Sequence, residues 1–323
     1  MDVAHMAYTL SPRIGSLLIL LCGSALAEEG GSGHYFPGSM SSFIDGIPSE
    51  PGFVVRAQYI GYDGDAAINR EFPYAGLIAG NVSAQTSVFG LTFLWAPRWD
   101  LGDKWSYAMT ATVPWVDIEV AADVRAPGGG PSVRRRDEQS ALGDIVLIPA
   151  MFRYKVSPDF SIDTRLALYA PTGDYEVGRL ANTGKNFWTI EPTVSLMYFG
   201  QKNGREASIF FGASFNQKND DTDYRSGTQV HIDGTLAQHF PLWKGLAGVG
   251  ISAFWYQQVE GDGGSGATLG DFKARTNGVG PELSFVKSRE NLTVSASLKW
   301  LSEFSNKNRL EGDIIWFKIV GSF

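Results

Sequence analysis

The chain has 323 residues, of which 44% are hydrophobic and 19% charged, and its formal net charge is −7. Such a low charged fraction is unusual for a soluble domain, and the acidic balance argues against a nucleic-acid partner. Beyond the N-terminal leader, no apolar run approaches the ~18 residues that a membrane-spanning helix needs. Insertion into a membrane would therefore require a closed β-barrel, in which the strands pair their backbone groups with one another.

Residues 1–27 have the features of a secretory signal peptide. Arg13 precedes the apolar run Leu17–Leu21, and Ala25-Leu26-Ala27 provides the residues that a signal peptidase requires. We expect cleavage after Ala27. Cys22, the single cysteine of the chain, would leave with this leader, so the mature protein would contain no disulfide.

Residues 28–52 are rich in Gly, Ser and Pro and show no period. They nevertheless contain the runs His34-Tyr35-Phe36-Pro37-Gly38 and Phe43-Ile44, which are too apolar for an ordinary linker. We expect an ordered segment that lies either on the periplasmic side or inside the lumen of a barrel as a partial plug. A disordered tail is the alternative.

Apolar and polar residues alternate from residue 53 to the end of the chain, which is the period of β-strands. At ~3.3 Å per residue and a tilt of roughly 40°, the stretch from Trp188 to Tyr198 rises about 25 Å, the height of an outer-membrane apolar band. An aromatic residue closes each end of its apolar face, where water meets lipid. Twelve such strands are expected, at residues 53–62, 84–96, 105–120, 142–154, 160–171, 187–199, 206–219, 228–240, 246–259, 278–287, 292–303 and 310–323.

The connections predict the topology. Those after even-numbered strands are short, at residues 155–159, 200–205, 241–245 and 288–291, and those after odd-numbered strands are mostly long, at 63–83, 121–141, 172–186 and 260–277. Short periplasmic turns that alternate with long extracellular loops are typical of outer-membrane barrels. Prolines at positions 114, 149, 192 and 281 fall inside these strands and each removes a ladder donor, so we expect β-bulges there or strand ends displaced by a few residues.

Several short sequence pieces follow one another in a characteristic order over nearly the whole chain after the leader. They include His34-Tyr35-Phe36-Pro37-Gly38, Gly143-Asp144-Ile145, Ala170-Pro171-Thr172-Gly173, Gly184-Lys185-Asn186-Phe187-Trp188, Glu191-Pro192, His231 with Asp233, Trp255-Tyr256-Gln257-Gln258 and Asn308-Arg309. Together they resemble the outer-membrane family named after the meta-pathway of phenol degradation. The resemblance implies a barrel that transports aromatic or other hydrophobic compounds, and it bears on architecture more than on cargo.

By parity, one face of the strands would line the lumen with acids, bases and aromatics. The candidate residues are Asp163, Arg165, Tyr169, Glu191, His231, Asp233, Phe254, Tyr256, Gln258, Lys299, Trp316 and Lys318. Acids and bases on neighbouring strands can pair, which would make this set a stabilising network. Alternatively, part of the set lines a path for a small amphiphilic molecule, with aromatic rings as apolar walls.

The sequence does not favour an enzyme. The histidines after the leader are His34, His231 and His239, and His231 is followed two residues later by Asp233 rather than by a nucleophile such as Ser. The acidic stretch 219–223 offers oxygen ligands but lacks the glycine and the terminal Glu of a calcium loop. We predict no catalytic site, no metal site and no cofactor.

We therefore predict an all-β protein in which residues 53–323 form a transmembrane antiparallel β-barrel of about 12 strands in a Gram-negative outer membrane. It would serve as a channel for passive uptake of small hydrophobic compounds, aromatic ones included. A general diffusion channel or a structural barrel without a specific ligand is the alternative. The expected partners are outer-membrane lipid and lipopolysaccharide, the small hydrophobic ligand, and the assembly machinery that reads a C-terminal strand ending at Phe323.

Overall fold

A computed structural model describes residues 33–66 and 70–323, so the predicted leader, residues 1–27, lies outside the described residues. The described elements are η1 (Phe43–Asp45), a short 3-10 helix, and the strands β1 (Gly52–Asp65), β2 (Glu71–Tyr74), β3 (Leu77–Ala96), β4 (Trp105–Arg125), β5 (Val133–Leu142), β6 (Ile145–Lys155), β7 (Phe160–Ala170), β8 (Thr189–Phe199), β9 (Arg205–Asn216), β10 (Gln229–Leu242), β11 (Gly245–Gln258), β12 (Arg275–Arg289), β13 (Leu292–Lys307) and β14 (Glu311–Ser322). Among the described residues, no helix is long and apolar enough to span a membrane.

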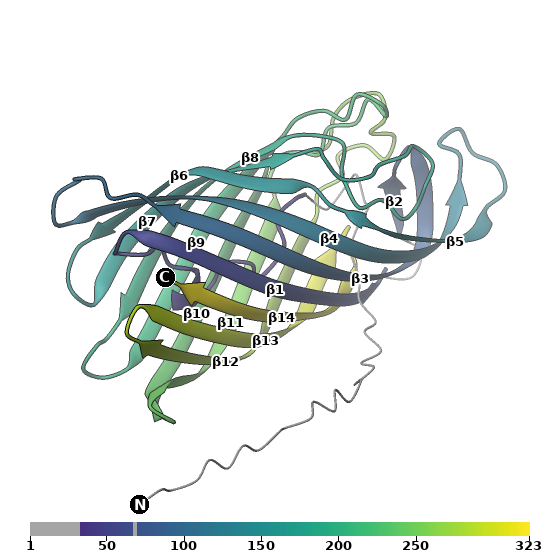
Figure 1. Cartoon of the computed structure of the whole chain (residues 1–323). Coiled ribbons are helices and arrows are strands. Elements are labelled where there is room, and N and C mark those ends of the chain that lie inside the picture. Colours follow the sequence, from purple (N-terminus) through teal and green to yellow (C-terminus); the bar gives the residue numbers. More distant parts are fainter. Residues whose placement is uncertain (1–32, 67–69) are drawn as a thin grey trace, which may run out of the picture.

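The sheet closes on itself (Figure 1). β1 lies between β14 and β3, and β3 pairs in turn with β4, all antiparallel. Of the fourteen strands in the sheet order, β2 and β5 stand outside this ring, and the other twelve form the wall. The predicted twelve-stranded antiparallel barrel is confirmed. Closure pairs the edges of the wall strands with one another, as a β-structure in lipid requires.

The short connections lie together at one end of the barrel, at the left in Figure 1, where the C-terminus also lies. They fall between β6 and β7, β8 and β9, β10 and β11, and β12 and β13, at residues 156–159, 200–204, 243–244 and 290–291. These are the four turns that the sequence predicts as short. The opposite end carries the longer connections 171–188, 217–228 and 259–274, together with a short one at 308–310, so the asymmetry is confirmed for most of the connections.

Two of the predicted long loops are largely strand instead. β3 and β4 continue to pair beyond the rest of the wall, up to Ile78 opposite Arg125, and β2 and β5 extend this hairpin on either side. The expectation of loops at residues 63–83 and 121–141 was therefore wrong. The physical reason is that the inner face of the extension is apolar, since Val82, Val120 and Val124 are buried there. Such residues gain more from packing on a sheet than from a solvated loop.

Large apolar side chains cover the outer surface of the wall. On β8, Ile190 and Val194 are 41% and 44% exposed, while the intervening Glu191 and Thr193 are 1% and 3% exposed. An exposed aliphatic row of this kind is stable in hydrocarbon rather than in water, as in outer-membrane barrels. Trp188 and Tyr198 lie at the two ends of the row, where the sequence places the membrane interfaces.

One of the four strand prolines coincides with a β-bulge. At Pro149 the register of β6 shifts against both β4 and β7, so that the buried face moves from Ile148 to Met151. Pro114 lies where the neighbour of β4 changes from β6 to β5, and Pro192 and Pro281 pair with their neighbours without a shift of register. The expected bulge is confirmed at Pro149 alone.

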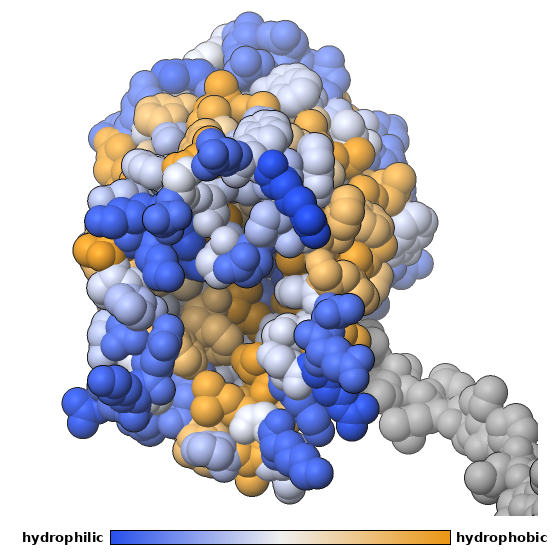
Figure 2. All heavy atoms as spheres, turned by 60° about the vertical axis from the view of Figure 1, so that its left-hand side comes forward, coloured by the Kyte–Doolittle hydropathy of each residue, from blue (hydrophilic) through white to orange (hydrophobic). Residues whose placement is uncertain are grey.

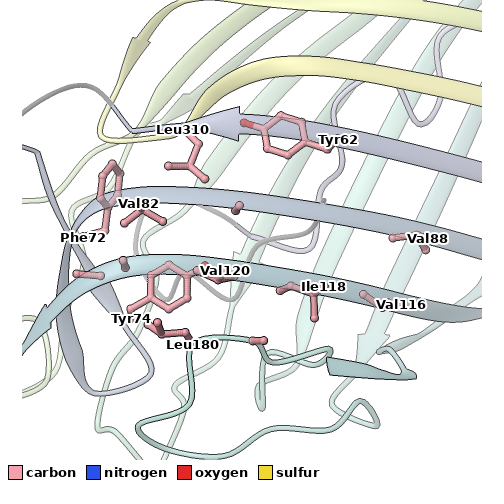
Figure 3. Close-up of a cluster of buried hydrophobic side chains, with 14 of the residues drawn as sticks. Tyr62, Phe72, Tyr74, Val82, Val88, Val116, Ile118, Val120, Leu180 and Leu310 are labelled. Atoms are coloured by element: carbon pink, nitrogen blue, oxygen red, sulfur yellow. The ribbon is translucent and has the colours of Figure 1, made fainter. Parts of the chain in front are cut away.

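An apolar cluster covers the inner face of β1, β3 and β4 toward the end with the longer connections (Figure 3). Tyr62, Val88, Val116 and Ile118 contribute from these strands, and Leu180 packs on them from the connection between β7 and β8. The inner wall is therefore apolar on this side of the barrel. The opposite side carries most of the charged residues described below.

Candidate functional site

The N-terminal residues 33–50 run inside the barrel, as the purple trace between the strands in Figure 1 shows. Their backbone bonds to inward side chains from separate parts of the wall. The amide of Ile47 donates to Asp163 on β7 at 3.0 Å, and the carbonyl of Pro37 accepts from the indole of Trp316 on β14 at 2.9 Å. These bonds place the segment across the lumen. We call residues 33–50 the lumen segment.

Tyr35 is the centre of an acidic cluster formed by β8 and β10. Its ring stacks on His231 at a centroid distance of 3.7 Å, and its hydroxyl donates to Asp233 at 2.7 Å. The other oxygen of Asp233 lies 2.9 Å from Nδ1 of His231, and Glu191 lies 3.7 Å from Nε2 of the same ring. Tyr169 and Ser214 donate to Glu191 in turn. The two buried carboxylates thus share one imidazole between them, and hydroxyl groups complete their hydrogen bonds.

A basic cluster on β13 and β14 holds the next part of the lumen segment. Nζ of Lys299 donates to the carbonyl of Gly38 at 3.0 Å, and Nζ of Lys318 donates to the carbonyl of Ser39 at 2.6 Å. Lys318 also lies 2.5 Å from Asp45. Both lysines are 0% exposed, so bonds to the segment replace the water that these ammonium groups would otherwise hold.

Asp45 is the acid that balances these bases. Burial alone would raise the pKa of this carboxyl, but Lys318, Lys299 and Arg56 together hold the pKa well below its ordinary value. Arg56 on β1 reaches the same carboxylate at 3.4 Å. Asp45 is therefore an ion-pair centre inside the lumen, and it belongs to the segment rather than to the wall.

Two arginines that share the carboxylate of Asp163 lie beside the end of the segment. Arg153 on β6 lies 2.9 Å from Asp163 on β7, and Arg165 lies 3.5 Å from the same carboxylate. Arg165 also donates to the carbonyl of Asp45 and contacts the sulfur of Met40 at 2.8 Å. Residues of the lumen segment thereby complete the bonding of a buried arginine in the wall.

Asp144 joins the lumen segment to an outer loop. It follows β5, and it lies 2.8 Å from Nε2 of His34. The backbone amides of Gly173 and Lys185, at the two ends of the connection between β7 and β8, donate to the same carboxylate at 2.8 Å each. Burial raises the pKa of Asp144, but the bonds from His34 and these amides outweigh it, so that the pKa is lowered. One carboxylate therefore links the wall, the segment and the loop.

Cavities remain between the lumen segment and the wall, and two of them lie beside its middle part. The outer one, of about 220 Å³, is lined mainly by apolar side chains that include Phe36, Ile60, Val88 and Val116. The inner one, of about 420 Å³, lies toward the short turns. A hollow with hydrophobic atoms at its floor is visible on the face that carries these turns (Figure 2).

The sequence placed all of its candidate residues on the correct face of the wall. Eleven of them are at most 6% exposed, and Tyr169 is half-buried; they are Asp163, Arg165, Glu191, His231, Asp233, Phe254, Tyr256, Gln258, Lys299, Trp316 and Lys318. Most of them bond to the lumen segment or to one another, and Gln258 bonds to the connection between β11 and β12. Arg165 borders the inner cavity, and Tyr169 and Trp316 border the outer one. The role of the set as a ligand path stays a prediction.

Sequence reasoning assigned no role to several residues of this site. His34 and Asp144 occur in the quoted family pieces, which was the available signal, but their sequence separation hides their contact. Asp45 lies in the segment without a period, so no parity argument applied to it. Arg153 follows the bulge at Pro149, where the alternation of faces is shifted by one residue.

The closed twelve-stranded wall, apolar outside and with buried charged side chains on part of its inner face, is that of an outer-membrane β-barrel. The chain belongs to the family described as "Putative MetA-pathway of phenol degradation", whose model matches residues 63–319. The resemblance seen in the sequence is confirmed.

A solved structure supports the same fold. The chain is similar to an outer membrane channel from Pseudomonas putida F1, with 17% identity and a TM-score of 0.63 over 90% of this chain and 100% of that chain. It is also similar to the β domain of the Bordetella autotransporter BrkA, with 11% identity and a TM-score of 0.46 over 84% and 100% of the two chains. A comparison with curated proteins gives no match.

Proposed function

We propose that the chain is an outer-membrane channel through which small hydrophobic compounds, aromatic ones included, enter by passive passage. The observation that carries this proposal is the apolar cavity of about 220 Å³ beside the lumen segment. Sites for small hydrophobic ligands are concave and mainly apolar, with a few polar groups that fix orientation. Tyr169, Trp316 and Asp144 lie at its edge.

The lumen segment argues against a general diffusion channel. It crosses the lumen and is bonded to β7, β10, β13 and β14, which leaves cavities beside it rather than a wide aqueous pore. A twelve-stranded barrel is narrow even without such a segment. A structural barrel without a ligand remains as the alternative outcome of the experiment below.

The partners follow from the same proposal. The aromatic side chain of Phe323 is 64% exposed, and its backbone pairs with Phe53, which completes the seam between β14 and β1. We expect the assembly machinery to read this terminal strand, and we expect lipid and lipopolysaccharide to surround the apolar outer face.

The test combines conductance with uptake. Single-channel conductance of the refolded protein in a planar bilayer would be measured with and without toluene, phenol and benzoate. Uptake of radiolabelled toluene would be compared between intact Gram-negative cells with and without the protein. Block of the conductance by one class of compound, together with faster uptake, supports the proposal. A silent barrel and unchanged uptake would favour a structural role.

A further inference from the structure

The lumen has two unlike sides. Buried acids and bases on β7, β8, β10, β13 and β14 bond to the lumen segment, as described above. The inner face of β1, β3 and β4 carries Ile60, Val88 and Val116, which border a cavity instead of bonding to the segment. Most of the polar bonds that hold the segment therefore come from one side. On the other side Phe36 packs on the apolar face and Arg56 bonds to Asp45, and a cavity remains beside them.

The two cavities share three lining residues on this side. Met40, Arg56 and Ile148 border both of them, so these three side chains form the neck between the outer and the inner cavity. Beyond the neck, the inner cavity continues past Leu94 and Ser295 toward Ser322, near the end with the short turns. The cavities thus follow one another along the axis of the barrel.

From this arrangement we infer that the cargo passes along the β1, β3, β4 and β6 side of the lumen, through the neck at Met40, Arg56 and Ile148, while the lumen segment stays in place. The inference rests on the proposed function and adds the route and the gate. Met40 suits a gate, because an unbranched thioether side chain changes rotamer easily and packs well against aromatic rings.

The cavities also define the class of cargo. An engineered apolar cavity of about 150 Å³ holds benzene, so the outer cavity of about 220 Å³ has room for one substituted ring. Four charged residues besides His34 border the outer cavity, namely Arg56, Asp144, Lys185 and Arg309. Asp144 pairs with His34, Arg56 with Asp45, and Arg309 lies 3.8 Å from Glu303. Because these charged groups have partners within the protein and the cavity walls are mainly apolar, the route favours a neutral single-ring compound over an aromatic acid.

Cysteine labelling tests the route, since Cys22 is the single cysteine of the chain and lies in the predicted leader. Val88→Cys places a thiol in the outer cavity and Ser295→Cys places one in the inner cavity. Ser195→Cys is the matched control, because Ser195 faces inward on β8, is buried, and borders neither cavity. Each variant would be treated with benzyl methanethiosulfonate, which adds one aromatic ring to the thiol.

Two readouts separate the route from the function. Toluene uptake by cells should fall to the level without the protein after labelling at Val88→Cys or Ser295→Cys, and should not change for Ser195→Cys. Line broadening of 4-fluorotoluene by the purified barrel in fluorine NMR should disappear with the label at Val88→Cys. Normal uptake by labelled Val88→Cys and Ser295→Cys would overturn the route and leave the function intact. An unlabelled barrel that neither binds nor passes toluene would overturn both.

Discussion

The hydroxyl of Tyr35 donates a 2.7 Å hydrogen bond to Asp233, although the two residues are 198 positions apart in the chain. The second oxygen of Asp233 lies 2.9 Å from His231, on which the ring of Tyr35 stacks. A residue of the segment thus completes a polar cluster of the wall. Removal of the segment would leave buried polar groups without partners, which explains why the segment stays in the lumen.

Tyr35→Phe should loosen the lumen segment. The substitution keeps the stack on His231 and removes the hydroxyl, and the loss of one buried bond to a charged acceptor costs about 1–3 kcal/mol. Limited proteolysis of the folded barrel should therefore cut within residues 33–50 faster than in the parent protein. Tyr59→Phe is the control, because its hydroxyl bonds to Ser87 on the neighbouring strand, away from the segment. Equal cleavage rates in Tyr35→Phe and Tyr59→Phe would contradict the anchoring role.

Lys318→Met should destabilise the folded barrel, because Lys318 is buried and pairs with Asp45. The change leaves Asp45 buried with Arg56 as its remaining direct ion-pair partner, at 3.4 Å. Removal of one member of a buried pair costs about 3–5 kcal/mol, because the other charge stays without compensation. The temperature at which the folded band disappears on a heat-modifiability gel should fall.

The double variant Lys318→Met/Asp45→Asn provides the control for that prediction. Because it removes both charges, it should recover part of the loss. If the double variant unfolds at a lower temperature than Lys318→Met, the ion pair is not the source of the effect.

Acid should not release the lumen segment until the solution is strongly acidic. The pKa of Asp45 is lowered by Lys318, Lys299 and Arg56 against the effect of burial. A carboxyl with a lowered pKa contributes stability fully above the unfolded pKa of about 3.9, and this contribution is lost as the pH falls through the folded value. Proteolysis within residues 33–50 should therefore be constant from about pH 7 to about pH 4 and should increase below that range. Asp45→Asn should abolish part of this acid response, and a transition of the parent protein near pH 6 would refute the assignment.

The alternation of residues predicted most of the wall, because the period of two directly sets which face each side chain occupies. Asp163, His231 and Lys299 could be placed in the lumen for this reason. Parity fails after Pro149, where the bulge adds a residue to β6 and turns Arg153 inward. The sequence alone does not show which of the four strand prolines lies at a bulge, because each of them removes one backbone N–H donor from the sheet.

The partners of the lumen residues could not be predicted at all. The sequence predicts pairs between acids and bases on neighbouring strands, but Asp233 and Lys299 each bond to the segment. No period fixes the path of residues 33–50, since their conformation depends on the wall that surrounds them. Their composition, apolar yet rich in glycine, indicated order but not position.

Gly173→Ala should detach the loop that closes the outer cavity. A methyl group at position 173 would lie 2.5 Å from Cα of Gly184 and 3.0 Å from the carbonyl carbon of Gly143, which is closer than Cβ atoms approach backbone. The amide of Gly173 would then lose its 2.8 Å bond to Asp144. Because Thr183 and Gly184 border the outer cavity, binding of 4-fluorotoluene should weaken as the loop moves.

Gly128→Ala is the matched control, since a methyl group there meets nothing within 4 Å. Unchanged 4-fluorotoluene binding in Gly173→Ala would show that the loop does not form a wall of the binding site.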